Sequence, residues 1–151
     1  MGSSPSATLF YGYYWQTDEE REAVEAARER TDLGEDWYDW KAELARRAGH
    51  PDPWVNYPSD PPKEALAEWR VITRQFGAGV DIGEHCEYDT CHYLYVEASR
   101  SHAGDWSGRA VNPAKMVVDP AWRAMLDRWL EAFGLQAPQA EPGWWLLSDY
   151  G

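Results

Sequence analysis

Both cysteines of the chain and two of its four histidines lie within eight consecutive positions, from His85 to His92. Thiolate sulfur and imidazole nitrogen are the usual ligands of zinc, and a histidine near a thiol can also activate it as a nucleophile. The candidate catalytic residues are therefore His85, Cys86 and His92. If a metal is bound, the candidate ligands are Cys86, His92 and His102.

The spacing of these residues argues against one site with four ligands. The surrounding sequence is typical of two short strands, 80–86 and 91–99, joined by a turn over 87–90. Neighbouring side chains of a strand point to opposite faces of the sheet, so a histidine and the cysteine beside it cannot both reach one ion. We therefore expect no bound metal. The sequence has no Walker-type phosphate loop and no dinucleotide fingerprint, so we expect no cofactor either.

Two registers of this predicted hairpin stay open. In the first, Cys86 lies opposite Cys91 and His85 lies opposite His92. In the second, shifted by one residue, Cys86 lies opposite His92. The shifted register is favoured because it also brings apolar residues of the two strands together. These residues are Val80 and Ile82 on one strand and Leu94 and Val96 on the other.

A second group of chemically able side chains lies in the segment 100–112, which shows no periodicity and contains glycines. A connection of 13 residues without regular structure is unusual in a compact domain and is commonly functional. Its cationic, imidazole and indole side chains can donate hydrogen bonds, stack and contact anions. The candidate binding residues are Arg100, His102, Asp105, Trp106 and Arg109.

The charge balance indicates what kind of partner the chain can attract. It has 14 Lys and Arg against 26 Asp and Glu, a net charge of −12 with neutral histidines. Such a field repels phosphates and attracts basic surfaces, so we expect a basic protein partner and no direct nucleic acid binding. The 10 tryptophans are too many to bury fully in 151 residues, which indicates that some line a contact surface or groove.

The length of 151 residues fits one domain with its own hydrophobic core. We expect residues 1–7 to form a flexible leader and residues 8–151 to form a single globular domain. The predicted elements follow the order strand, helix, helix, helix, strand, strand, helix, strand. This order indicates an α/β fold, with α+β as the alternative, in which about four helices cover a mixed sheet of four or five strands.

Four helices are predicted from capping residues and apolar periodicity. Thr17 and Glu20 match a capping box at the start of the first helix, whose thin apolar face is formed by Ala23, Val24 and Ala27. The segment 50–60 holds three prolines and is predicted as a loop. The predicted helices cover residues 18–30, a segment with Trp37, Trp40, Leu44 and Ala48 on one stripe, residues 61–76, and residues 120–133.

Further strands are predicted at both ends of the chain. An aromatic run over 8–15 indicates a buried strand, and residues 115–118 are predicted as a brief strand. The segment 144–150 is apolar at nearly every position, which is typical of a strand in the interior of a sheet. Deletion of the last eight residues is therefore expected to unfold the domain.

Three segments of the sequence carry a resemblance. They are LFYGY at 9–13, GEHCEYDT at 83–90 and PGWWLLSDYG at 142–151. Together they resemble a group of small uncharacterised bacterial and phage-borne proteins with an aromatic start, a His-Cys turn segment and a Pro-Gly-aromatic end. That group tends to have Pro-Met-Tyr after the turn, where this chain has Cys91-His92-Tyr93. The resemblance implies a phage or mobile-element context, and it implies no activity.

Three functions are compatible with these observations. We expect a small acidic accessory protein of the phage type that binds or inhibits a basic protein, with imitation of nucleic acid as one mode. The first alternative is an enzyme or metal-binding protein centred on the hairpin from His85 to His92, and a non-enzymatic role is preferred. The second alternative is a small-molecule or sugar binder that uses exposed Trp and Tyr. Because no apolar stretch approaches the roughly 20 residues that span a bilayer, we expect no membrane contact and a cytoplasmic protein.

Overall fold

The computed structural model describes residues 5–31, 40–86, 90–104 and 108–150. The chain combines a five-stranded sheet with helices, as predicted, in the α+β form that is the alternative to α/β in the sequence analysis. It divides into two compact units, one formed by residues 1–27 and 79–151 and the other by residues 28–78. Among the helices that the structure describes, none is both long and apolar enough to cross a lipid bilayer.

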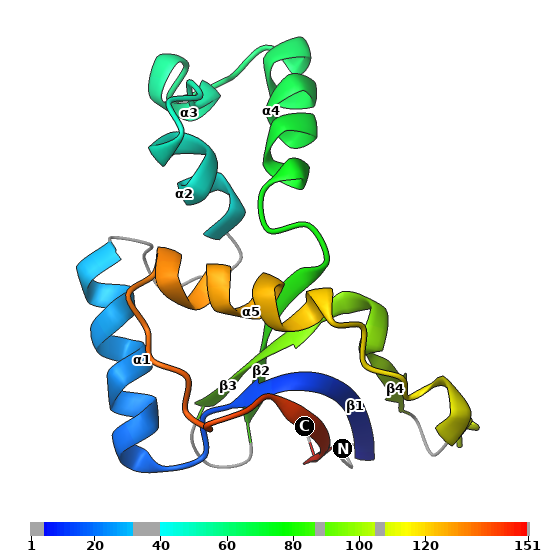
Figure 1. The fold of residues 1–151 in the computed structure, drawn as a ribbon. Helices are drawn as coiled ribbons and strands as arrows, with labels where there is room; N and C mark the ends of the chain where they lie inside the picture. The colour runs from blue at the N-terminus through cyan, green and yellow to red at the C-terminus, as the bar shows by residue number, and fades with distance from the viewer. Residues whose placement is uncertain (1–4, 32–39, 87–89, 105–107, 151) are drawn as a thin grey trace. The chain divides into compact units, whose positions relative to one another are not determined.

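The sheet of the larger unit is built around one long strand, β1 (Pro5–Tyr14) (Figure 1). Its partners are β5 along one edge and β3 and β4 along the other, and β2 pairs with β3. Every pair among the described strands is antiparallel, whereas the sequence predicts a mixed sheet. The reason is that β2, β3 and β4 follow one another through connections too short for parallel crossovers. The remaining strands are β2 (Val80–Cys86), β3 (Thr90–Val96), β4 (Ser101–Ala103) and β5 (Gly143–Tyr150).

The sheet is curled (Figure 1), and one of its faces is packed with aromatic rings. The ring of Phe10 stacks on Tyr93 with centroids 4.6 Å apart, and Leu147 completes this buried cluster. Burial of each such side chain contributes about 1.5–3 kcal/mol, so the alternation of aromatic residues in β1 drives formation of the sheet. The curl also brings β5 close to β2.

The opposite face of the sheet is covered by α5 (Ala121–Ala132), which packs on β2 and β3 (Figure 1). The predicted apolar stripe of this helix is confirmed, since Leu126, Trp129 and Leu130 are buried. The Asp119 carboxylate accepts a hydrogen bond of 2.8 Å from the Ala121 amide at the start of the helix. The helix therefore begins and ends where the sequence predicts, within two residues.

Helix α1 (Asp18–Thr31) begins with the predicted capping box. The Glu20 amide donates to Thr17 Oγ1 over 3.2 Å, and the Thr17 amide donates to Glu20 Oε2 over 3.0 Å. Val24 and Ala27 are buried, whereas Ala23, also expected on the apolar face, is exposed. Most of the helix surface thus carries charged side chains.

The smaller unit consists of α2 (Trp40–Arg47), α3 (Pro53–Asn56) and α4 (Lys63–Gln75). The predicted loop over 50–60 contains α3, because Asp52 supplies a cap: its Oδ1 accepts from the Trp54 amide over 2.9 Å. Asp52 Oδ2 also binds Arg46 over 2.6 Å. Trp37, predicted on the stripe of the second helix, lies outside the described residues.

Several strand boundaries differ from the prediction. Strand β1 begins at Pro5 rather than at residue 8, because its first residues pair with β5. Strand β3 ends at Val96, where a 3-10 turn over Glu97–Ser99 follows. The predicted strand over 115–118 is wrong, because these described residues form no strand. A 3-10 turn that Asn112 caps covers Pro113–Lys115.

Candidate functional site

The β2–β3 hairpin places its cysteines and histidines in neither of the two expected registers. His92 lies opposite Glu84, Cys91 opposite His85, and Cys86 opposite Thr90. The predicted pairing of Cys86 with His92 is therefore wrong, because Thr90 already belongs to β3 and the connection is one residue shorter than expected. The predicted contact of Val80 and Ile82 with Val96 and Leu94 is confirmed. The side chains of His85 and Cys86 lie outside the described part of the structure.

The imidazole of His92 is buried, with 1 % of the side chain exposed. Its Nε2 atom lies 3.3 Å from Glu25 Oε1 of α1, and its Nδ1 atom lies 3.9 Å from Glu84 Oε1. A group enclosed in this way can link α1 to the hairpin, but it offers little access to a substrate. The site of His92 is thus a packing site between secondary-structure elements.

His102 and Cys91, which could also take part in metal or thiol chemistry, contact other neighbours than His92 does. His102 on β4 lies with Nδ1 2.9 Å from Thr8 Oγ1 on β1. Cys91 is buried, and its Sγ atom accepts a hydrogen bond of 3.4 Å from Arg21. This bond, together with one to Asp18, raises the pKa of the Arg21 guanidinium. Among the described side chains, no group of three or more His, Cys, Asp or Glu could hold a metal ion.

The predicted binding segment 100–112 has a partly regular structure and forms one side of a cavity. Its residues 101–103 form β4, which pairs with β1. Arg100 and Arg109 both line the cavity, whereas His102 does not. Asp105 and Trp106 lie outside the described residues. Two of the five predicted binding residues are therefore brought together.

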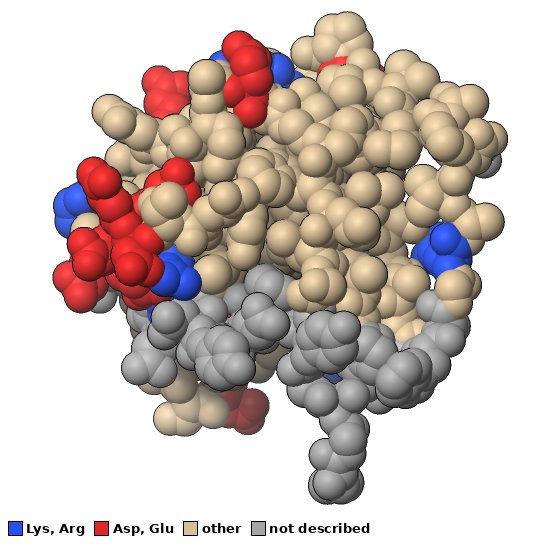
Figure 2. Space-filling view, turned by 90° about the horizontal axis from the view of Figure 1, so that it is seen from below, with Lys and Arg blue, Asp and Glu red and all other residues tan. Residues whose placement is uncertain are grey.

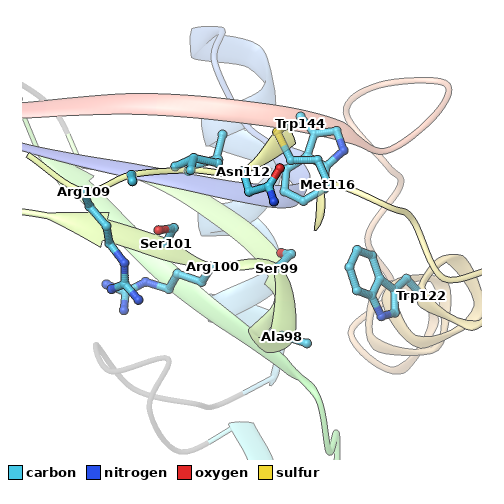
Figure 3. Close-up of a pocket in the computed structure, with 12 residues that line it drawn as sticks. Ala98, Ser99, Arg100, Ser101, Arg109, Asn112, Met116, Trp122 and Trp144 are labelled. Atoms are coloured by element: carbon cyan, nitrogen blue, oxygen red, sulfur yellow. The ribbon is translucent and has the colours of Figure 1, made fainter. Parts of the chain in front are cut away.

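The cavity has a volume of about 270 Å³ and is lined by residues from five parts of the larger unit (Figure 3). β1, the turn before β4 together with the first residue of β4, the segment 108–116, the first turn of α5 and the start of β5 all contribute to it. The described lining residues are Leu9, Ala98, Ser99, Arg100, Ser101, Arg109, Ala110, Val111, Asn112, Met116, Trp122 and Trp144.

The cavity has a cationic end and an aromatic end. Figure 3 shows the side chains of Arg100 and Arg109 extending to the same side, away from Trp122 and Trp144. The two indoles are fixed by Tyr11 of β1, whose ring centroid lies 5.6 Å from Trp122 and 5.5 Å from Trp144. The wall that they form is therefore rigid, while the arginines are exposed.

Sequence reasoning missed the indole half of this cavity. Trp122 is predicted from its spacing as a member of the core stripe of α5, and Trp144 as part of an interior strand. Both are only partly buried. No sequence signal indicates that the start of β5 lies beside the start of α5, because this proximity depends on the pairing of β5 with β1.

A second cavity, of about 440 Å³, lies at the start of α1. Its floor is Trp15, and Glu19 and Glu20 of α1 contribute carboxylates. The helix adds further exposed carboxylates beside it, and Figure 2 shows acidic side chains gathered on the side where α1 lies in Figure 1. The described lining residues are Trp15, Thr17, Glu19, Glu20, Ala23, Gln136, Ala137 and Pro138.

Glu20 and Glu19 have different roles at this second cavity. The Glu20 carboxylate accepts from the amides of Gln16 and Thr17 over 2.7 Å and 3.0 Å, so it is committed to the helix start. Glu19 and Glu22 form no ion pair with the described residues and are exposed. A cation that enters the cavity would therefore meet Glu19 first. No protein-family model, curated protein or solved structure matches this chain.

Proposed function

We propose that this protein binds a basic segment of a partner protein through the first turns of α1 and the adjoining cavity floored by Trp15. The observation that supports the proposal most directly is the position of Asp18, Glu22 and Glu25 at helical spacing on α1, all exposed, next to a cavity of about 440 Å³. Residues four and three positions apart share one face of a helix, so these carboxylates form an acidic stripe, within which Asp18 pairs with Arg21 and Glu25 lies beside His92.

The residues that line the cavity suit a Lys or Arg side chain. Such a side chain places its alkyl stem on apolar surface and keeps its charged end near carboxylates. Ala23 and Pro138, beside the buried Trp15, supply the apolar surface, and Glu19 supplies the carboxylate. The net charge of −12 adds long-range attraction for a basic partner, which raises the association rate at low salt.

The acidic stripe is also compatible with imitation of a nucleic acid backbone. In that mode the partner is a protein whose basic surface binds phosphates, as expected for an accessory protein of the phage type. His92 is poorly placed for catalysis, because it is enclosed between Glu25 and Glu84. The small-molecule alternative is favoured by the cavity between Arg109 and Trp144, which is a separate site.

A charge-reversal experiment tests the proposal. The probe is a fluorescent peptide of eight residues rich in Arg and Lys, and its affinity is measured by fluorescence anisotropy at low and physiological salt. The double variant Glu19→Lys with Glu22→Lys is expected to weaken binding at least tenfold. Its matched control, Glu64→Lys with Glu131→Lys, changes the net charge equally at exposed positions of other helices.

The control decides between a local site and the overall charge. If both double variants weaken binding equally, attraction by net charge alone explains it and the proposal is wrong. The variant Ala23→Leu fills part of the cavity without changing any charge. It is expected to weaken binding of the peptide, and unchanged affinity would exclude the cavity from the site.

A further inference from the structure

We propose that the cavity between Arg109 and the indoles of Trp122 and Trp144 binds a small aromatic acid, with its anionic group at Arg109 and its ring against the indoles. This site is distinct from the acidic surface of α1, and it takes a ligand of opposite charge. The inference follows from the hydrogen-bonding inventory of the cavity, from its local charge and from its aromatic wall.

The polar side chains of the cavity offer more hydrogen-bond donors than acceptors, and the Ser101 hydroxyl can act as either. Guanidinium and indole groups can only donate hydrogen bonds. The Ser99 hydroxyl is already used in both directions, because it accepts from the Tyr11 amide over 2.9 Å and donates to the Val96 carbonyl over 2.6 Å. Asn112 Oδ1 accepts from the Ala114 amide over 3.0 Å, so the polar atom of Asn112 outside this bond is its donor nitrogen. Such a cavity favours a ligand that accepts hydrogen bonds.

The local charge is opposite to that of the protein. The chain contains 26 acidic residues, yet none is among the described residues that line this cavity. Arg46, Arg47 and Arg123 each pair with a carboxylate. Within the described part of the chain, by contrast, Arg100 and Arg109 take part in no ion pair.

The two arginines of the cavity are placed differently, because Tyr95 packs against the Phe10 cluster, whereas Trp122 packs on Tyr11 at the opposite face of the sheet. Arg100 is held in place by the Tyr95 ring, whose centroid lies 5.9 Å from its Cζ atom. A planar carboxylate or phosphate fits the fork of a guanidinium group through two parallel hydrogen bonds. Arg109 is therefore the arginine with which an anionic group in this cavity would pair.

The opposite end fits a flat apolar group. The planes of Trp122 and Trp144 are inclined by 72° with centroids 6.4 Å apart, so they form a corner rather than a slot. An aromatic ring can lie on one indole and meet the edge of the other, the preferred geometry of aromatic pairs. The volume of about 270 Å³ is slightly below the range of about 300–1,000 Å³ for drug-sized ligands, which indicates a small ligand.

A sugar fits this cavity less well than an aromatic acid. Sugar hydroxyls donate hydrogen bonds and are usually met by carboxylate or amide oxygens, which the described lining does not offer beyond Asn112. The tryptophans of this cavity, Trp122 and Trp144, can stack on a ligand and lie in the same cavity as arginine cations. This combination favours an acid over a neutral sugar.

The experiment compares three probes on the full chain by isothermal titration calorimetry. The probes are naphthoate, the neutral naphthamide of the same shape, and inorganic phosphate. Naphthoate is expected to bind at least tenfold more tightly than either of the other two. Equal binding of naphthamide would overturn the anionic half of the proposal, and equal binding of phosphate would overturn the aromatic half. Absence of naphthoate binding would overturn both.

Variants then locate the binding. Arg109→Gln is expected to weaken naphthoate binding at least tenfold, whereas Arg70→Gln, the same change at an exposed position of α4, leaves it unchanged. Ala110→Trp fills the cavity from its exposed rim and is expected to abolish binding with both arginines intact. If neither Arg109→Gln nor Ala110→Trp changes the affinity, the ligand binds elsewhere and the assignment is wrong.

Discussion

The backbone of Gly12 in β1 lies directly against the carbonyl group of Leu94 in β3. A Cβ atom on Gly12 would overlap the carbonyl oxygen and carbon of Leu94. Gly12 is at the point where β1 pairs with Tyr95 on one side and with Gly143 on the other. The absence of a side chain therefore permits the close approach of three strands at the centre of the sheet.

The first prediction concerns this close approach. Gly12→Ala forces the backbone of β3 to move, so we expect a loss of about 3 kcal/mol or more in the free energy of unfolding, measured by urea denaturation. Gly143→Ala is the control, because no heavy atom lies within 4 Å of a Cβ atom built there. Equal stability of the two variants would show that β3 does not lie against Gly12.

The second prediction compares two neighbouring leucines of β5. Leu147 is 9 % exposed and packs with Phe10 and Tyr93, whereas Leu146 is 71 % exposed. We expect Leu147→Ala to lower the free energy of unfolding by about 2–3 kcal/mol and Leu146→Ala to change it by less than about 0.5 kcal/mol. A larger loss for Leu146→Ala in thermal or urea denaturation would contradict the observed orientation of β5.

The position of β5 shows what a sequence pattern can and cannot predict. The apolar run over 144–150 correctly predicts a strand, but its interior position is wrong: among the described strands β5 pairs only with β1. Its apolar residues serve different neighbours, because Trp144 lines a cavity, Leu147 joins the core and Leu146 faces solvent. A local sequence pattern shows which side chains are apolar. Which residues these side chains contact depends on the order of the strands in the sheet.

The same limit applies to the sites. Capping chemistry is local, so Thr17 and Glu20 correctly predict the start of α1. Arg100 and Arg109 are recognisable as binding residues from their irregular segment, and both line the cavity. The partnership of these arginines with Trp144 could not be predicted, because it requires the pairing of chain segments more than 30 residues apart.

The third prediction concerns the buried His92 and its carboxylate partner on α1. His92→Ala removes a side chain that is 1 % exposed, and we expect a loss of about 2–4 kcal/mol in the free energy of unfolding. Glu25→Gln keeps the shape of its half-exposed partner, so its expected cost is about 1 kcal/mol or less. Guanidinium denaturation checks both values. If His92→Ala were as stable as the wild type, the imidazole could not link α1 to the hairpin.

The fourth prediction concerns the C-terminal strand as a whole. Removal of residues 144–151 eliminates all but one of the register pairs that β5 makes with β1 and removes Leu147 from the aromatic cluster. We expect the truncated chain to lose cooperative thermal unfolding and the dispersed amide signals of a folded protein in NMR spectra. A sharp unfolding transition in the truncated chain would show that β1 is held in the sheet without β5.

The fifth prediction concerns the pH dependence of stability. Burial, and in second place the carboxylate of Asp81 opposite it in the β2–β3 ladder, raise the pKa of Tyr95 to about 12. The unfolded chain has the ordinary tyrosine pKa of 10.0. Because the folded state holds the phenolic proton more tightly, this contribution to stability is complete below about pH 10 and is lost as the pH rises towards about 12.

A shift of one pKa unit corresponds to about 1.4 kcal/mol, and partial exposure of Tyr95 reduces the total to about 1–2 kcal/mol. The wild type is therefore expected to lose more stability than Tyr95→Phe between about pH 9 and about pH 11.5, measured by urea denaturation at each pH. Tyr57→Phe, at a position that is 48 % exposed, is the control and should behave as the wild type. If Tyr95→Phe lost as much stability as the wild type over this range, the phenol of Tyr95 would not be buried beside Asp81.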